Sequence, residues 1–425
     1  MAGALDSPAR PETVFTYAAP PLVYGRGAVA EIPFALRHAG RVLVVTDAGV
    51  AATGAPERVA EALRAAGHEV ATYAGVHVEP TDASLRDAVE QARATGPWDA
   101  LVAVGGGSSI DTAKAVALLT ANPGDLLDYV NAPIGGGRAP EHPLPPLVAV
   151  PTTTGTGAES TTVCVLDVLD RHVKTGISHA ALRPSLAVVD PDLTASQPPM
   201  VTASSGLDVL CHALESYTAR PYTAFEAKRP EQRVPYCGAN PVSDLWAEKA
   251  LGLMSESFVR AVTDGSDAEA RAGMALAATL AGMGFGNAGV HVPHADAYPI
   301  AGRARDYRPD GYPDGEALVP HGIAVSLTAP AAFRLTFPAS PERHLRAARL
   351  LDPRADAEHP QDVLPGVLRR IVEAVGVPGR LHDVGFTAAD VPDLVDGALA
   401  QQRLLALAPV ALTPDDLAEV FRASL

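Results

Sequence analysis

A carboxylate and an imidazole stand four residues apart in the segment GLDVLCHALE, which covers residues 206–215. On a helix, residues with this spacing project from the same face, so Asp208 and His212 would lie side by side. Their neighbours are mostly apolar, as in a helix that faces a protein core. Taken alone, the pair is best explained as a buried structural hydrogen bond, and half of a metal site is the alternative.

Three more histidines in the same half of the chain could complete such a metal site. His291 and His294 belong to the segment HVPHADAYPIAG, and His321 belongs to the segment VPHG. Imidazoles with one carboxylate suit Fe(II) or Zn(II) and leave a position for a substrate oxygen. A lone histidine is more often structural, and the chain has 13 of them. Three histidines near turns marked by Gly and Pro nevertheless favour a metal site over coincidence.

A second group of residues is suited to bind a nucleotide. The segment VAVGGGSSIDTAK, residues 102–114, passes from an apolar strand through Gly105–Gly107 to the start of a helix. Glycines let the backbone approach a phosphate, and a helix N-terminus offers free N–H groups and the positive end of a dipole. Ser108 could cap this helix or contact the phosphate. A tight strand-to-helix turn without a ligand is the alternative.

Two further strand ends carry polar residues that could contact the same nucleotide. Asp47 ends the strand segment RVLVVTDAG, where a carboxylate could accept hydrogen bonds from a ribose and repel a 2′-phosphate. The alternative for Asp47 is a role in the turn that follows the strand. The loop PTTTGTGAES, residues 151–160, also follows a strand. Ligands of α/β sheets bind at the carboxyl ends of the strands, where both segments would lie.

The pattern along the chain predicts two domains that would position these residues. Apolar strands at 41–49, 69–76 and 186–193 alternate with helical segments at about 56–67 and 81–95. Residues 99–119 have the pattern of a strand, a glycine turn and a helix, and residues 146–160 that of a strand that runs into a polar loop. Such alternation predicts a parallel sheet with helices on both faces. After about residue 196 helical segments prevail, with Thr413 as the N-cap of the last one. We therefore expect an α/β dinucleotide-binding domain at 1–195 and an all-α metal-binding domain at 196–425.

Composition excludes several classes of protein. The 425 residues are 47% hydrophobic and 19% charged, which permits large cores and excludes wholesale disorder. A net charge of -16 argues against a nucleic-acid partner. The uncharged stretch 272–290 has the length of a membrane span but consists largely of Ala and Gly, so we predict a buried helix that ends in a Gly-rich turn. Three separated cysteines and the absence of a targeting pattern predict a cytoplasmic protein.

Five segments together resemble the iron-containing alcohol dehydrogenase family: GGGSSIDTAK, PTTTGTGAES, GLDVLCHALES, HADAYPIAG and VPHG. Their order matches the family across nearly the whole chain. The resemblance implies the cofactor NAD, a divalent metal with Fe(II) favoured over Zn(II), and a homodimer or higher homo-oligomer. The implied metal ligands are Asp208, His212, His294 and His321. The implied cofactor-binding residues are Asp47, Gly105, Gly106, Gly107, Ser108, Asp111, Thr152, Thr153, Thr156 and Lys174.

A finer resemblance, to the hydroxyacid–oxoacid transhydrogenase branch of this family, rests on five further segments. They are VHVEPTDAS, LLDYVNAPIGGG, CGANPVSDLWA, GMGFGNAGVHVPHADAYPI and RLLALAP. Many alcohol dehydrogenases of the family have a second histidine four residues after the third ligand, where this chain has Tyr298. The stretch from His294 to His321 is also longer than in enzymes for short alcohols. Tyr298 is therefore a candidate catalytic residue, and a simple alcohol is a doubtful substrate.

This branch implies hydride transfer between two small acids through NAD. The substrate oxygen would be polarised by the metal as a Lewis acid, while the protein positions the nicotinamide. A hydroxyacid such as 4-hydroxybutyrate would reduce NAD, and an oxoacid such as 2-oxoglutarate would reoxidise it in place. The substrate carboxylates need a cation, because a buried unpaired charge is costly. Arg303 and Arg305 are candidates, with solvated loop charges as the alternative.

Three other functions compete with this interpretation. An ordinary NAD-dependent alcohol dehydrogenase or aldehyde reductase would differ only in how the cofactor turns over. A lyase similar to dehydroquinate synthase would need a cluster of Lys and Arg for a sugar phosphate, and none surrounds the metal motifs. A binding protein without activity would not need four metal ligands.

Overall fold

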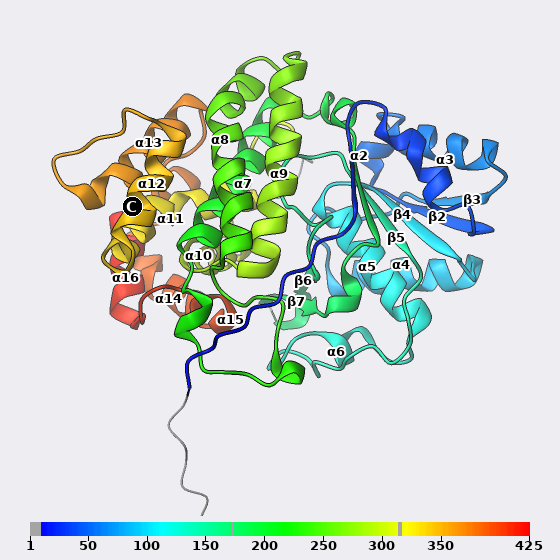
Figure 1. Cartoon of the computed structure of the whole chain (residues 1–425), viewed down its shortest axis with the longest axis horizontal. Helices are drawn as coiled ribbons and strands as arrows, with labels where there is room; N and C mark the ends of the chain where they lie inside the picture. Colours follow the sequence, from blue (N-terminus) through cyan, green and yellow to red (C-terminus); the bar gives the residue numbers. More distant parts are fainter. Residues whose placement is uncertain (1–9, 172, 313–316) are drawn as a thin grey trace, which may run out of the picture.

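Six parallel strands form the centre of the N-terminal half (Figure 1) in the computed structural model, which describes residues 10–171, 173–312 and 317–425. Their order in the sheet is β1-β8-β5-β4-β2-β3. The strands are β1 (Leu22–Tyr24), β2 (Arg41–Val45), β3 (Glu69–Tyr73), β4 (Ala100–Gly105), β5 (Leu147–Pro151) and β8 (Leu186–Val189). The inner strands are buried on both faces, which explains their continuous apolar sequences. The predicted parallel sheet is confirmed.

Helices cover both faces of this sheet. On one face α1 (Ile32–Ala35) and α3 (Ala55–Ala65) pack on the apolar side chains of β2, β4 and β5. On the other face lie α4 (Asp82–Thr95), α5 (Gly107–Ala121) and α6 (Leu126–Tyr129). α5 is buried along nearly its whole length. Its N-terminus follows the carboxyl end of β4, an inner strand of the sheet.

The strand order places a ligand crevice between β2 and β4. β3 pairs with one side of β2, whereas β4, the next strand along the chain, pairs with the other side. Where the winding direction reverses in this way, the connections leave the sheet in opposite directions and open a crevice at the carboxyl ends of the strands. Asp47 follows β2 and Gly105 ends β4, so both lie at this reversal.

A hairpin that the sequence pattern did not reveal is attached to the same domain. Strands β6 (Val163–Val168) and β7 (Val173–Ser178) pair with each other in antiparallel orientation. Cys164 and Leu166 are buried in the apolar cluster beneath α5. The hairpin matters for function because it carries Lys174.

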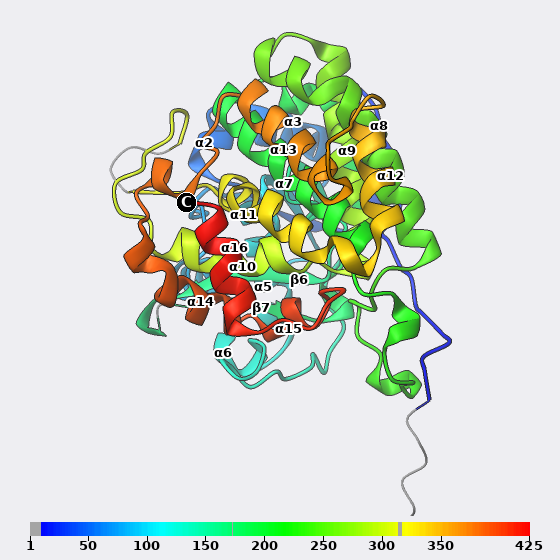
Figure 2. The same cartoon turned by 90° about the vertical axis from the view of Figure 1, so that its left-hand side faces the viewer.

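The second half of the chain is helical in all its described elements, as predicted. They include α7 (Pro199–Thr218), α8 (Pro241–Thr263), α9 (Ala268–Ala288), α10 (Val292–Gly302), α11 (His321–Thr336), α12 (Pro341–Leu351), α13 (Val363–Ala374), α14 (Val391–Leu399), α15 (Gln402–Leu405) and α16 (Pro414–Ala423). α7 packs against α8, α9 and α11, while α16 packs beside α11 and α14 (Figure 2). The division proposed at residue 195 falls between β8 and α7.

Two local predictions in this half are confirmed. α9 is a buried helix that ends at Gly289, whose φ of 88° is in the left-handed region that favours glycine. Within the described residues, no helix is both long and apolar enough to cross a membrane. Thr413 caps α16 by accepting a hydrogen bond from the Asp416 N–H at 3.2 Å. Residues 219–240 contain two short 3-10 turns, Tyr222–Ala224 and Pro230–Gln232. The described residues of 303–320 contain no helix or strand, and 313–316 lie outside the described residues.

Candidate metal centre and cofactor cleft

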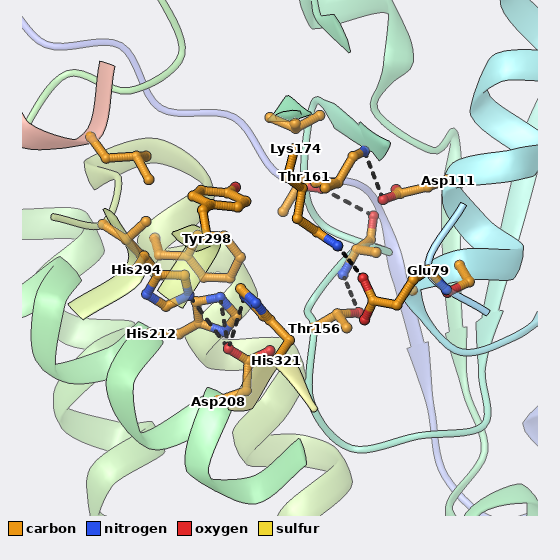
Figure 3. A pocket seen from close by; sticks show the side chains of 18 of the residues that line it. Glu79, Asp111, Thr156, Thr161, Lys174, Asp208, His212, His294, Tyr298 and His321 are labelled. Atoms are coloured by element: carbon orange, nitrogen blue, oxygen red, sulfur yellow. Dashed lines mark hydrogen bonds and ion pairs between the residues drawn. The ribbon is translucent and has the colours of Figure 1, made fainter. Parts of the chain in front are cut away.

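Three imidazoles of the helical half converge on one carboxylate oxygen (Figure 3). The Oδ1 atom of Asp208 lies 3.4 Å from Nε2 of His294, 3.6 Å from Nε2 of His212 and 3.8 Å from Nε2 of His321. Asp208 and His212 share a face of α7, while α10 contributes His294 and α11 begins with His321. Three helices therefore bring the four predicted ligands together.

The spacing of these atoms fits one small cation. Ligand atoms that bind a single tetrahedral ion at about 2.1 Å are about 3.4 Å apart. Asp208 Oδ1 and His294 Nε2 are buried and have no hydrogen-bond partner among the described residues. Unpartnered buried polar atoms are costly, and a metal ion would satisfy both. The tightest group comprises Asp208, His294 and His321, and His212 joins it through its 3.6 Å approach to Asp208 while its ring stacks on Phe285.

The charges at the centre are tuned by burial and by proximity. Burial alone would raise the pKa of Asp208, but the surrounding imidazoles hold this pKa well below its usual value. Burial lowers the pKa of His212 to about 3, so its ring is neutral near pH 7. A neutral imidazole and an ionised carboxylate are the forms that bind metals.

Glu215, which the sequence analysis did not assign a role, orients one of the ligands. Its side chain is fully buried and forms a short hydrogen bond with Nδ1 of His294. It also accepts hydrogen bonds from the backbone N–H groups of His291 and His294 at 2.8 and 3.2 Å. Such a carboxylate fixes the ring so that Nε2 faces the metal position. Its spacing of seven residues after Asp208, two helical turns along the same face, is the signal that could have revealed it.

His291, the fifth candidate, does not face the centre. Its Nε2 atom lies 3.0 Å from Oγ1 of Thr218, and its ring packs edge-on against Phe333. Burial lowers the pKa of His291 to about 4, as expected of a neutral histidine in a core. This histidine therefore has the structural role that the sequence left open.

A cleft of about 510 Å³ runs from the crevice of the sheet to the metal centre. It contains Asp208 and His321 at one end and Asp47 at the other. Between them lie most of the residues predicted to bind the cofactor, namely Gly106, Gly107, Ser108, Thr152, Thr153 and Thr156. One continuous cleft therefore connects the predicted nucleotide-binding residues with two of the predicted metal ligands.

The glycines of this cleft are required by the threonine loop that faces them. A Cβ atom on Gly107 would lie 2.7 Å from Cγ2 of Thr156, and one on Gly106 would lie 3.2 Å from Oγ1 of Thr153. Gly105, buried at the end of β4, would place a Cβ 2.3 Å from Oγ of Ser109. The glycine loop and the threonine loop therefore meet too closely to leave free space for a side chain at Gly106 or Gly107.

Asp47 combines a local role with a position in the cleft. One carboxylate oxygen accepts the Val50 N–H at 2.9 Å and caps α2 (Ala48–Ala51). The other accepts the hydroxyl of Ser109 at 3.2 Å. The turn role considered from the sequence is therefore real, and the side chain still faces the cleft that would hold a ribose.

A smaller cavity of about 140 Å³ opens beyond the metal centre. It borders the cofactor cleft, because six residues line both, namely Glu79, Gly107, Ser108, Thr156, Asp208 and His321. Three predicted site residues, Asp111, Lys174 and Tyr298, line this inner cavity and not the cleft. A small substrate in the cavity would therefore contact both the metal position and the inner end of the cleft.

Three charged groups of the inner cavity, Glu79, Asp111 and Lys174, each have an oppositely charged partner. Figure 3 shows the ion pair between Glu79 and Lys174. Lys174 forms a short ion pair with Glu79 and lies 3.3 Å from Asp167. Lys174 holds the pKa of Glu79 below its usual value although burial opposes this shift. Asp111 binds the fully buried Lys114 at 3.1 Å and accepts the N–H of Val165. Glu79 has no sequence signal of a functional residue, and its φ of 58° is uncommon for a residue other than glycine.

The two arginines proposed for the substrate carboxylate lie elsewhere. Arg305 is exposed and forms an ion pair with Asp390, and Arg303 is also exposed. Neither lines the inner cavity or the cofactor cleft. Tyr298, in contrast, lies over the metal centre, with its ring centroid 6.2 Å from that of His321.

This fold and this site define a class of metal-dependent dehydrogenase, and comparison with known proteins agrees. Residues 19–191 match the iron-containing alcohol dehydrogenase family, and residues 231–425 match the C-terminal domain of the same family. The chain belongs to this family and is an oxidoreductase. The lyase and the inactive binding protein considered from the sequence are thereby set aside.

Particular relatives narrow the comparison further. The chain is 44% identical over 419 residues to the mitochondrial hydroxyacid-oxoacid transhydrogenase of Xenopus laevis, covering 97% of this chain and 90% of the relative. It is 43% identical to the human protein of the same name, covering 95% and 88%. A solved 1,3-propanediol oxidoreductase superposes with a TM-score of 0.84 at 30% identity, covering 97% of this chain and all of that one. The relatives' names place them in mitochondria, so a cytoplasmic location stays a prediction.

Proposed function

We propose that this protein is a hydroxyacid–oxoacid transhydrogenase that moves a hydride from a small hydroxyacid to NAD and then from NADH to an oxoacid. With 4-hydroxybutyrate and 2-oxoglutarate the products would be succinic semialdehyde and 2-hydroxyglutarate. The observation that carries the proposal is the small inner cavity, which meets the cofactor cleft at Asp208 and His321. The 44% identity to a relative of that name supports it.

The chain's residues divide the work of this reaction. Asp208, His212, His294 and His321 would hold a divalent metal, which supplies Lewis-acid polarisation of the substrate oxygen when bound. The Gly105–Ser108 loop, the N-terminus of α5 and the threonine loop would hold the dinucleotide phosphates. The border between cleft and cavity would place the nicotinamide beside the carbon that gives or takes the hydride.

Tyr298 is the proposed hydrogen-bond donor at the reacting oxygen. Burial raises the pKa of its hydroxyl, so this group stays protonated near neutral pH. A protonated phenol can donate to the oxygen of either acid.

The finer features of the cofactors are proposals too. We propose NAD over NADP because Asp47 lies in the cleft, and Fe(II) over Zn(II) because the family is named for iron. Mixed imidazole and carboxylate ligands accept either metal, so the metal content of the purified protein decides. A homodimer or higher homo-oligomer also stays a prediction.

The test is product analysis of the purified protein with deuterium at C4 of 4-hydroxybutyrate. With 2-oxoglutarate and NAD at the enzyme concentration, we expect many turnovers and deuterium at C2 of 2-hydroxyglutarate. A large pool of unlabelled NADH added to a parallel sample should dilute this label little, because NAD is reoxidised in place. Free NADH formation that 2-oxoglutarate does not suppress would instead identify an ordinary dehydrogenase, which is the second candidate function.

A further inference from the structure

We propose that Arg403 binds the substrate carboxylate that lies far from the reacting carbon, in both half-reactions. The inference rests on the proposed function, because it names the residue that selects acids over alcohols. Arg403 lines the inner cavity although, of the four predicted metal ligands, only His321 lies within 100 residues of it in the sequence.

The charge balance of the inner cavity singles out this arginine. Among the described residues that line it, the only Lys and Arg side chains are Lys174 and Arg403. Lys174 is held between the carboxylates of Glu79 and Asp167, so its charge is already compensated. In the described part of the chain, Arg403 has no carboxylate within ion-pair distance. An incoming carboxylate would therefore find its counter-charge at Arg403.

The position of Arg403 suits a contact with the remote end of a substrate. α15, which carries Arg403, packs against α10, which carries His294 and Tyr298. The guanidinium lies over the ring of Tyr236 at 5.1 Å from its centroid, and this contact orients the group without neutralising it. Arg403 is an exposed residue that also lines the inner cavity, as expected of a group at the cavity rim. A guanidinium can also bind a carboxylate through two parallel hydrogen bonds.

The two proposed substrates share the feature that one fixed cation would recognise. In 4-hydroxybutyrate, the reacting carbon C4 is three bonds from the carboxylate carbon C1. In 2-oxoglutarate, the reacting carbon C2 is likewise three bonds from the carboxylate carbon C5. With the reacting oxygen at the metal position, both acids would place a carboxylate at the same distance from it. One arginine could therefore serve the oxidation and the reduction.

The experiment compares Arg403→Ala and Arg403→Lys with the unaltered enzyme on 4-hydroxybutyrate and on 1-butanol, the uncharged alcohol of equal carbon number. Loss of a hydrogen-bonded charge pair should lower kcat/KM for the acid by about 10- to 100-fold. The value for 1-butanol should change less than about threefold, because no ion pair is lost there. Arg403→Lys should retain part of the selectivity, since it keeps the charge but not the paired geometry.

Arg303→Ala is the matched control, because Arg303 is an exposed arginine of the same half that lines neither cavity. It should leave both substrates unaffected. The reduction of 2-oxoglutarate should fall together with the oxidation of 4-hydroxybutyrate in Arg403→Ala. Metal content and the circular dichroism spectrum of each variant show whether the fold is intact.

The outcomes separate this inference from the proposed function. If the unaltered enzyme does not turn over the two acids, the transhydrogenase proposal fails, and the proposed role of Arg403 in binding their carboxylates fails with it. If the unaltered enzyme uses both acids but folded, metal-loaded Arg403→Ala keeps the same preference for acid over 1-butanol, the proposed role of Arg403 alone is overturned. An equal loss for acid and alcohol would also overturn it, because that result indicates a structural role.

Discussion

The two ends of the cofactor cleft are built in different ways. At the metal end, side chains from three helices approach one oxygen of Asp208, and each contributes a charge or a lone pair. At the nucleotide end, the glycine loop faces the threonine loop so closely that a Cβ on Gly107 would lie 2.7 Å from Cγ2 of Thr156. Replacing a ligand at the metal end should abolish metal binding, whereas replacing a glycine at the nucleotide end should change the shape of the surface that binds the cofactor.

The largest effect is expected from Asp208→Ala, because all three histidines approach this carboxylate. The variant should lose its bound metal, and the Lewis-acid contribution of several kcal/mol with it. The value of kcat/KM should then fall by about 10³-fold or more. Metal analysis and activity on 4-hydroxybutyrate are the measurements.

His291→Gln provides the control for that prediction. His291 is buried next to the centre but bonds to Thr218, and the Gln amide can reach the same hydroxyl. This variant should keep its metal even if it loses about 1 kcal/mol of stability. Full metal occupancy in Asp208→Ala, or metal loss in His291→Gln, would contradict the assignment of ligands.

A smaller effect is expected from Glu215→Gln, which keeps the size of the side chain but removes the charge beside His294. Substitution of such supporting carboxylates typically lowers metal affinity by about 10- to 100-fold. Titration with a competing chelator measures this change, and activity should recover at saturating metal. If the melting temperature falls while the metal affinity stays the same, Glu215 has only a structural role.

Features with local sequence signals could be predicted, whereas features that depend on contacts between distant residues could not. The parallel sheet and the glycine turn have local signals, namely apolar strands, turn residues and helix caps. The metal ligands lie in short motifs that the family shares, so their convergence could be expected. Glu79 and Arg403 lie in VHVEPTDAS and RLLALAP, two of the segments that carry the finer resemblance, but nothing in the sequence indicates that residues more than 300 positions apart line one cavity. Arg303 and Arg305 were proposed from nearness in sequence, which on a loop does not predict nearness in space.

At the nucleotide end, Gly107→Ala should weaken NAD binding while the metal stays bound. The added Cβ would lie 2.7 Å from Cγ2 of Thr156, so one of the two loops must move. Overpacking of this kind costs about 1–3 kcal/mol, or roughly tenfold or more in the Kd for NAD. Adding Thr156→Ser, which removes Cγ2, should restore part of the affinity. Gly252→Ala is the control, since nothing lies within 4 Å of its added Cβ, and its NAD affinity should not change.

The smallest effect concerns the choice between NAD and NADP. Asp47 lies in the cleft, where its charge would repel a 2′-phosphate, but its oxygens are also engaged by Val50 and Ser109. Asp47→Gly removes both the charge and the side-chain cap of α2, and the lost cap costs roughly a few tenths of a kcal/mol. Asp47→Asn removes the charge while its amide oxygen can still accept the Val50 N–H.

If repulsion sets the preference, both Asp47 variants should bind NADP several-fold more tightly than the unaltered enzyme, and Asp47→Asn should do so without loss of stability. The Kd values for NADH and NADPH, measured by fluorescence titration at two salt concentrations, give the answer. Added salt should narrow the difference in the unaltered enzyme, because it screens a charge at the cleft surface. An unchanged NADPH affinity in both variants would mean that Asp47 serves only the turn after β2.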